Sequence, residues 1–194
     1  MVNLTRIYTR TGDTGTTALG DMSRVSKNDL RLVAYADVDE ANAAIGVVSA
    51  TPGPDAEMAD LLTRIQNDLF DVGADLCTPV VEKPEHPPLR VEQGYVDQLE
   101  VACDYYNERL SPLRSFVLPG GTLMAAHLHV ARTIVRRAER STWAALSEHG
   151  ETMNPLTATY LNRLSDLLFI LSRVANTPDS GGDGDRLWNP GGER

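Results

Sequence analysis

Apolar residues recur every three or four positions along most of this chain, from Leu30 onward. In the clearest segment they fall at Met58, Leu62, Ile65, Leu69, Val72 and Leu76. This period places the apolar side chains on one face of a helix, and the two-residue alternation of strands is nearly absent. The pattern predicts five helices, whose apolar faces lie around residues 38–48, 58–76, 95–110, 122–148 and 155–175.

The segments between these helices carry the residues that end helices. "TPGPD" (51–55) offers Asp55 as an N-cap, and "TPVVEKPEHPPLR" (78–90) has four prolines, which a helix interior does not tolerate. "SPLRSFVLPGG" (111–121) and "HGETMNP" (149–155) separate the later helices. We therefore predict an all-α, five-helix bundle over residues 30–176, within a single domain covering 1–194. Residues 1–29 form an N-terminal segment, and the Gly- and Asp-rich residues 177–194 form a flexible tail.

Composition narrows the class of protein. The chain has 194 residues and a formal net charge of −9, which argues against a general nucleic-acid binder. It contains no apolar run long enough to span a membrane and no signal-peptide core at its start. Its two cysteines, Cys77 and Cys103, stand far apart and predict buried free thiols, as expected in the cytoplasm.

The stretch "YTRTGDTGTTALGD" (8–21) follows no apolar period. Gly12 and Gly15 allow backbone amides to converge on an anion, and Asp13 offers a carboxylate to a magnesium ion on phosphate oxygens. Arg10 and Lys27 add positive charge nearby. Hydroxyl donors come from Thr9, Thr11, Thr14, Thr16 and Thr17. The same residues also suit the turn of an N-terminal hairpin, and this stretch alone leaves both interpretations open.

The segment "HVARTIVRRAER" (129–140) is the densest basic cluster of an acidic chain. Arg132, Arg136 and Glu139 are spaced four and three, so they share one helix face, with Arg137 and Arg140 at its sides. Arginine suits bidentate binding of phosphate. The alternative is a solvated charged face, which is what most charge runs are.

Two further segments carry polar residues at helical spacing. Asn162, Asp166, Phe169 and Arg173 form a line in the last helix, and Asp39 lies among small residues in "VDEANAAIG" (38–46). A surface ion pair is an alternative role for each acid. The histidines form no metal or catalytic cluster, and we find no nucleophile or general base. The sequence predicts binding and positioning of phosphate.

Several of these segments together resemble the PduO-type ATP:cob(I)alamin adenosyltransferases, also called corrinoid adenosyltransferases. The matching pieces are "YTRTGDTGTT" (8–17), "SKND" (26–29), "AYADVDEANAAIG" (34–46), "FVLPGG" (116–121), "HVARTIVRRAER" (129–140) and "YLNRLSDLLFILSR" (160–173). They occur in family order from Tyr8 to Arg173. The resemblance implies a homotrimer of five-helix bundles with sites between subunits. It implies transfer of the 5′-deoxyadenosyl group of ATP to the cobalt of reduced cobalamin, with release of triphosphate.

The resemblance also assigns roles to residues. The opening stretch becomes the ATP polyphosphate loop, with Tyr8, Thr9, Arg10, Thr11, Gly12, Asp13, Gly15, Thr16 and Thr17. Lys27, Arg136, Arg137, Glu139, Arg140 and Asn162 match nucleotide-binding positions. Asp39 and Arg132 match an ion pair between subunits near the site, and Phe116 matches an aromatic residue below cobalt. Arg136, Asp39, Arg132 and Phe116 are the expected catalytic set. No protein metal site is assigned, and Mg²⁺ is expected with the ATP phosphates.

This reaction fits a sequence without a nucleophile, because cob(I)alamin itself attacks C5′ of the ribose. Phe116 is expected to exclude a lower axial ligand, so that Co(II) becomes four-coordinate and accessible to a flavin reductase. An adenosylcobalamin-dependent mutase is a further expected partner. The alternative function is an escort that carries adenosylcobalamin to a mutase. An intact polyphosphate loop favours catalysis over this role, and the phosphate-binding residues argue against a plain helical scaffold.

Overall fold

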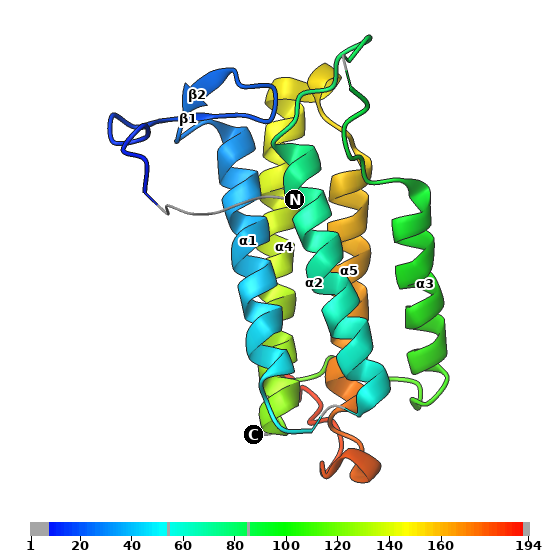
Figure 1. Ribbon diagram of the computed structural model, residues 1–194. Coiled ribbons are helices and arrows are strands. Elements are labelled where there is room, and N and C mark those ends of the chain that lie inside the picture. Colours follow the sequence, from blue (N-terminus) through cyan, green and yellow to red (C-terminus); the bar gives the residue numbers. More distant parts are fainter. Residues whose placement is uncertain (1–7, 54, 85, 192–194) are drawn as a thin grey trace.

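The computed structural model describes residues 8–53, 55–84 and 86–191. Its helices are α1 (Leu30–Ser49), α2 (Ala56–Leu76), α3 (Gln93–Asn107), α4 (Leu123–His149) and α5 (Leu156–Val174), with short 3-10 turns η1 (Gly150–Thr152) and η2 (Pro178–Ser180). All five lie side by side along one axis (Figure 1). The predicted five-helix bundle is confirmed. Residues 1–7 and 192–194 of the predicted N-terminal segment and tail lie outside the described residues.

Three of the helices begin with a side-chain N-cap. The Asp29 carboxylate accepts a hydrogen bond from the Arg31 amide at the start of α1, and Asp55 accepts one from the Met58 amide at 2.8 Å in α2. Thr122 accepts one from the Ala125 amide at 3.1 Å in α4. Each bond satisfies an amide that the first helical turn leaves without an intrahelical partner.

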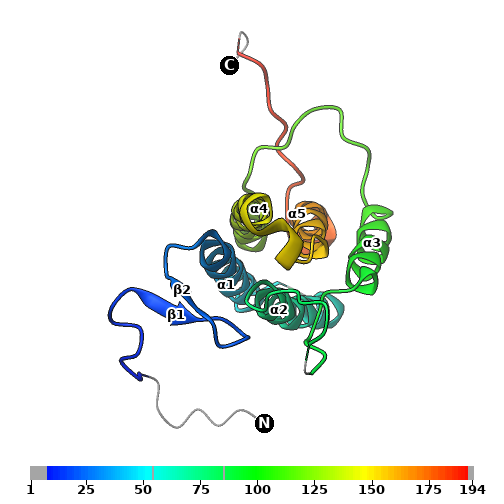
Figure 2. The same ribbon diagram turned by 90° about the horizontal axis from the view of Figure 1, so that it is seen from above.

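The apolar faces meet along α5, α4 and α1. α4 packs against both α1 and α5, α2 packs against α1, and α3 packs mainly against α5. From above, α1, α2, α4 and α5 form a compact group and α3 stands beside it (Figure 2). The side chains at the centre of α5 are fully buried, among them Leu161, Leu164, Leu167, Leu168 and Leu171. This core holds α4, which carries the arginine cluster, in a fixed orientation.

A two-stranded hairpin precedes the bundle. β1 (Thr16–Ala18) pairs antiparallel with β2 (Arg24–Ser26), and the turn between them is closed by a hydrogen bond from the Leu19 amide to the Ser23 carbonyl at 2.8 Å. The Gly20 amide donates to the Cys77 carbonyl at 2.8 Å, and a β-carbon on Gly20 would lie only 2.3 Å from the Thr78 hydroxyl oxygen. The hairpin is thus docked onto the end of α2. Strands of three residues are too short to give an alternating pattern in the sequence.

The tail makes more contacts than its glycine content predicts. Leu187 pairs with Val117 in an antiparallel bridge, and the Trp188 amide donates to the Phe116 carbonyl at 2.7 Å. The Arg173 guanidinium forms an ion pair with Asp185 at 2.8 Å. Prediction of a flexible tail therefore does not account for residues 185–188, because strand-like pairing with residues 116–118 depends on tertiary structure that composition does not encode.

Two other expectations concern cysteines and membranes. Cys77 and Cys103 are both free, as predicted, but they are half-buried and not fully buried; burial raises the pKa of the Cys103 thiol to about 11. In the described part of the chain, none of the helices combines the length and apolar character needed to cross a membrane.

Candidate functional site

The glycine-rich stretch forms an exposed loop in front of the hairpin. The hairpin turn lies at residues 19–23, so "GDTG" (12–15) is not that turn, contrary to the alternative interpretation of the sequence. Instead the Gly15 amide donates to the Gly12 carbonyl at 3.2 Å, with Gly15 at φ 80°, where a side chain would be strained. The Lys27 amide donates to the Gly15 carbonyl at 2.9 Å. These bonds fold residues 12–15 back onto the start of the Lys27 segment.

Two cations lie against this loop. A β-carbon placed on Gly12 would be 3.1 Å from the Lys27 amino nitrogen, so the ammonium group rests directly on the glycine. Arg24 donates to the Thr11 carbonyl at 2.8 Å and to the Thr16 hydroxyl at 2.6 Å. Sequence reasoning missed Arg24, whose role follows only from the pairing of β2 with β1. The Thr9 and Thr11 hydroxyls lie 2.9 Å apart, and Asp13 is exposed. The loop therefore presents hydroxyls, a carboxylate and two cations to solvent.

The predicted arginine face lies on α4, where Arg136 and Arg140 are exposed. Arg137 differs from them, because its guanidinium pairs with Glu40 of α1 and lies 3.5 Å from Asp37. Hydrogen bonding to Glu40 raises the pKa of Arg137 above its usual range. In the single chain Arg137 thus joins α4 to α1.

Glu139 and Asn162 come together between α4 and α5. The Asn162 amide donates to a Glu139 carboxylate oxygen at 3.1 Å, and Asn162 is exposed. Two residues that the resemblance assigns to nucleotide binding therefore form one polar unit, although 23 positions separate them in sequence.

A cavity of about 690 Å³ opens beside the N-terminal half of α4. Phe116 enters it from the loop after α3 with 77% of its surface exposed, and its ring centroid lies 6.0 Å from that of Trp188. Arg132 of α4 lies in the wall. The lining residues are Leu113, Arg114, Ser115, Phe116, Val117, His129, Arg132, Phe169 and Trp188. The cavity thus combines two of the predicted catalytic residues, Phe116 and Arg132.

Arg132 connects this cavity to the arginine face. It is partly buried, and burial lowers its pKa, with a further contribution from the charge of Arg136 one turn away. Arg136 lies one turn further along the same face of α4 and is exposed outside the cavity lining. Asp39, the expected partner of Arg132, is exposed on α1.

Several residues around the cavity were not recognised from sequence as site residues. His129 is 3% exposed, and its ring lies 6.3 Å, centroid to centroid, from that of Phe169 on α5. In the sequence His129 belongs to no metal or catalytic cluster. Trp188 stood in a segment predicted to be a flexible tail. An apolar period cannot identify such residues, because they meet only when the tail, the 111–121 loop and α4 are assembled.

The hairpin and the 111–121 loop lie on different sides of the bundle. Viewed from above, the hairpin lies outside α1 and α2, whereas the 111–121 loop and the tail pass outside α4 and α5 (Figure 2). The structure brings Phe116 together with Arg132, and Glu139 with Asn162. Lys27 rests on Gly12 of the loop, whereas Arg136 is exposed on α4.

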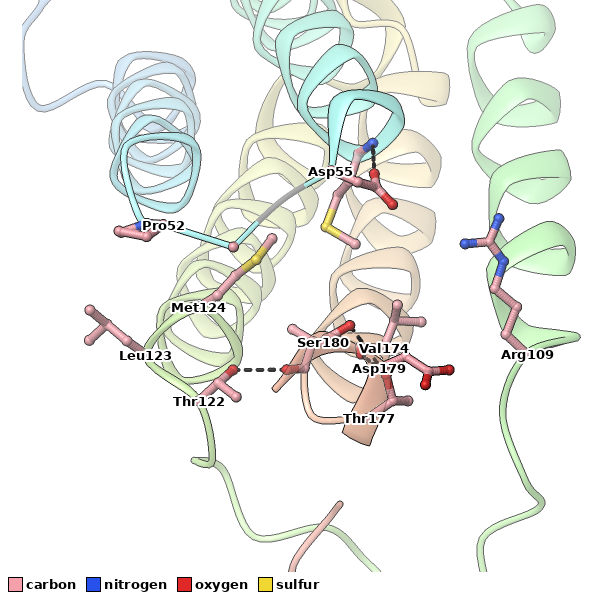
Figure 3. A pocket seen from close by; sticks show the side chains of 13 residues that line it. Pro52, Asp55, Arg109, Thr122, Leu123, Met124, Val174, Thr177, Asp179 and Ser180 are labelled. Atoms are coloured by element: carbon pink, nitrogen blue, oxygen red, sulfur yellow. Dashed lines mark hydrogen bonds between the residues drawn. The ribbon is translucent and has the colours of Figure 1, made fainter. Parts of the chain in front are cut away.

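A separate cavity of about 330 Å³ lies at the end of the bundle where α4 begins. Thr122, Asp179 and Ser180 border it, Met124 projects into it, and Arg109 approaches from α3 (Figure 3). The Thr122 hydroxyl donates to the Ala175 carbonyl at 2.9 Å, which ties the start of α4 to the end of α5. None of the predicted site residues lines this cavity, so it is distinct from the candidate site.

The side chains were also tested as metal ligands. Among residues 8–53, 55–84 and 86–191, no group of three or more His, Cys, Asp or Glu side chains could hold a metal ion. Asp13 alone offers an exposed carboxylate beside the loop. One carboxylate fits a magnesium ion that takes most of its ligands from phosphates and water, but not a dedicated protein site.

Comparison with known proteins agrees with this geometry. Residues 7–175 match the model of a family described as cobalamin adenosyltransferase. A corrinoid adenosyltransferase of Mycobacterium tuberculosis is 66% identical, covering 100% of this chain and 97% of the relative, and a cobalamin adenosyltransferase of Cupriavidus metallidurans is 48% identical, with 95% of each covered. A variant PduO-type ATP:corrinoid adenosyltransferase from Lactobacillus reuteri, solved with cobalamin and ATP, superposes with a TM-score of 0.87 at 35% identity, covering 95% of this chain and 99% of the other. With a family model over most of its length and a relative of this identity, the chain belongs to the cobalamin adenosyltransferase family.

Proposed function

We propose that this protein transfers the 5′-deoxyadenosyl group of ATP to the cobalt of cob(I)alamin, at a site formed between two copies of the chain. One observation carries the proposal. Arg132, in the wall of the cavity that holds Phe116, lies one turn of α4 before the exposed Arg136, whose charge is close enough to contribute to the lowered pKa of Arg132. A corrin ring in the cavity would therefore have the reacting end of ATP beside its upper face.

Binding of the triphosphate is assigned to the loop and to α4. The Gly12–Gly15 turn, the threonine hydroxyls and Lys27 offer donors to the phosphates, while Arg136 approaches from the next copy. Glu139 and Asn162, joined at 3.1 Å, are suited to the nucleoside end. A magnesium ion on the phosphates, reached by Asp13, would neutralise part of the charge that the leaving group develops.

On the corrin side the protein positions its substrate. The electron pair of Co(I) forms the Co–C bond at C5′, and the C5′–O bond breaks with its electrons leaving on triphosphate. No protein group needs to accept or donate a proton, and the charged groups that hold triphosphate stabilise the departing oxygen. Phe116, exposed within the cavity, is placed to keep a lower axial ligand from cobalt. The electron that converts Co(II) to Co(I) would come from a flavin reductase.

Completion of the site by a second copy is supported by two features. The hairpin that leads into Lys27 stands outside α1 and α2 (Figure 2), whereas Arg136 is exposed on α4. An apolar groove of about 280 Å³ between α1 and α4 is lined by Val47, Val130 and small residues of α1, and these two valines are 52% and 54% exposed. A homotrimer that covers this groove would bring Asp39 of one copy to Arg132 of another.

The experiment that tests the function follows the corrin spectrum. The protein is incubated anaerobically with ATP, Mg²⁺ and cobalamin under strong reduction, and samples without ATP or without protein serve as controls. We expect adenosylcobalamin, identified by its spectrum and light sensitivity, together with one triphosphate per corrin. Consumption of ATP to ADP and phosphate without a new corrin species would contradict the proposal.

A further inference from the structure

His129 is a buried polar residue without a role in the scheme above. Its side chain lies in the wall of the Phe116 cavity and only 3% of its surface is exposed, yet neither ring nitrogen has a hydrogen-bond partner among the residues that the structure describes. Leaving such groups unpaired in a folded protein is costly, and a buried polar group without a partner calls for an explanation. One turn along α4, the Nε atom of Arg132 is likewise buried without a partner in the described chain.

These two residues carry complementary hydrogen-bonding groups, buried in the wall of the cavity. Arg132 Nε carries a hydrogen and is only a donor, whereas a neutral imidazole offers one bare nitrogen as an acceptor and one N–H as a donor. Burial lowers the pKa of His129, and the charge of Arg132 lowers it further against a small opposing effect of Asp185, so the ring is neutral near pH 7. The pair thus offers a donor and an acceptor on one side of the cavity.

A primary carboxamide matches this arrangement, and the rim of the corrin ring carries several acetamide and propionamide groups. The amide oxygen would accept from Arg132 Nε–H, and the amide NH₂ would donate to the bare nitrogen of His129. A carboxylate lacks an N–H group, so it could pair with His129 only through the other tautomer of the ring, in which an N–H faces the cavity.

Resting on the function proposed above, we infer that His129 is a specificity-determining residue that, with Arg132, binds one peripheral carboxamide of the corrin ring. Phe169, whose ring lies 6.3 Å from the imidazole, fixes the histidine from the α5 side. Apart from Arg114 and Ser115, the rest of the cavity wall is apolar.

The first test measures corrin binding, without turnover. Cob(II)alamin is titrated into the wild-type protein and into His129→Leu, and the absorbance change gives Kd. We expect Kd to rise about tenfold in His129→Leu, as for loss of a buried hydrogen bond. His129→Gln, whose amide supplies both a donor and an acceptor, should recover most of the affinity. His149→Leu on the same helix, where the ring bonds to Asp29 at 3.0 Å, is the matched control and should keep the wild-type Kd.

The second test measures discrimination. Cobalamin monocarboxylates, each with one peripheral amide hydrolysed, are titrated in the same way. The wild-type protein should bind one of them with a Kd that differs from that of cobalamin, and His129→Leu should bind that acid and cobalamin with more similar Kd values. ATP affinity and sedimentation of His129→Leu should match those of the parent protein.

Three results would overturn the inference: an unchanged Kd for His129→Leu, discrimination that persists in that variant, or dissociation of its subunits, which would assign the histidine to contacts between copies. These results are separable from a failure of the proposed function. If the proposed function were wrong, the wild-type protein itself would neither bind cob(II)alamin nor form adenosylcobalamin.

Discussion

At the scale of single residues, the candidate site is made of groups that position and polarise. Arg136 is exposed on α4, and Phe116 is exposed within its cavity, so neither side chain contributes much to the buried core. This separation lets substitutions at these positions report on function with little effect on folding. The proposed transfer needs no catalytic base, because both electrons of the new bond come from the corrin substrate.

Replacing Arg136 by Ala should reduce turnover by a factor on the order of a hundred or more, because one fixed charge facing the leaving triphosphate is lost. Helicity and thermal unfolding should stay unchanged. Turnover at saturating ATP and Mg²⁺ is the measurement. Arg163→Ala is the control, since this arginine pairs on the surface with Glu100 and Asp166. If both variants keep near-normal rates, Arg136 belongs to a solvated face only.

Replacing Phe116 by Ala should spare ATP affinity and impair the cobalt side of the reaction. Without the ring, water or the cofactor's own base can take the lower axial position, and five-coordinate Co(II) resists reduction. Turnover from cob(II)alamin with a flavin reductant should therefore fall steeply, while turnover from pre-reduced cob(I)alamin should fall much less. Equal losses in the two assays would identify Phe116 as a structural anchor.

At the scale of elements, the helices were predictable and their accessories were not. The Met58–Leu76 period describes α2 because a buried helical face repeats regularly along the sequence. The short strands and the pairing of the tail depend on contacts between residues that are distant in the sequence. Residues 16–18 become a strand only because Arg24–Ser26 pair with them, and Leu187 becomes ordered only beside Val117. The resemblance supplied the roles of the loop and of Phe116, but the contribution of His129 required the assembled cavity.

The loop in front of β1 makes a prediction at this scale. A β-carbon on Gly12 would meet the Lys27 amino nitrogen at 3.1 Å, so Gly12→Val should displace the ammonium from the phosphate site. We expect affinity for ATP with Mg²⁺ to fall about tenfold, the value for a charge-assisted hydrogen bond, while unfolding of the bundle stays unchanged. Calorimetric titration measures this. Gly94→Val, at a glycine in α3 with no atom within 4 Å of the new β-carbon, is the control. Equal ATP affinity in both variants would remove Lys27 from the site.

At the scale of the whole molecule, the two halves of the proposed site belong to different parts of one chain. The hairpin and loop stand outside α1 and α2 (Figure 2), whereas the cavity that holds Phe116 is lined by Arg132 of α4. A closed ring of identical copies, in which each loop reaches the α4 of its neighbour, makes as many complete sites as there are subunits. This arrangement is the central claim of the account, and it does not depend on which residue contributes most to the rate.

Subunit mixing tests that claim most directly. Subunits with Arg136→Ala and subunits lacking residues 1–17 are each inactive by expectation, but each keeps the half that the other has lost. Co-expressed with two different tags and isolated as mixed assemblies, they should regain adenosylation of cob(I)alamin at about a third of the sites, because every mixed ring of three copies contains one pair of neighbours with both halves intact. Mixed assemblies that form and fold yet show no activity above either parent would place the loop and Arg136 in the same chain's site and contradict the account.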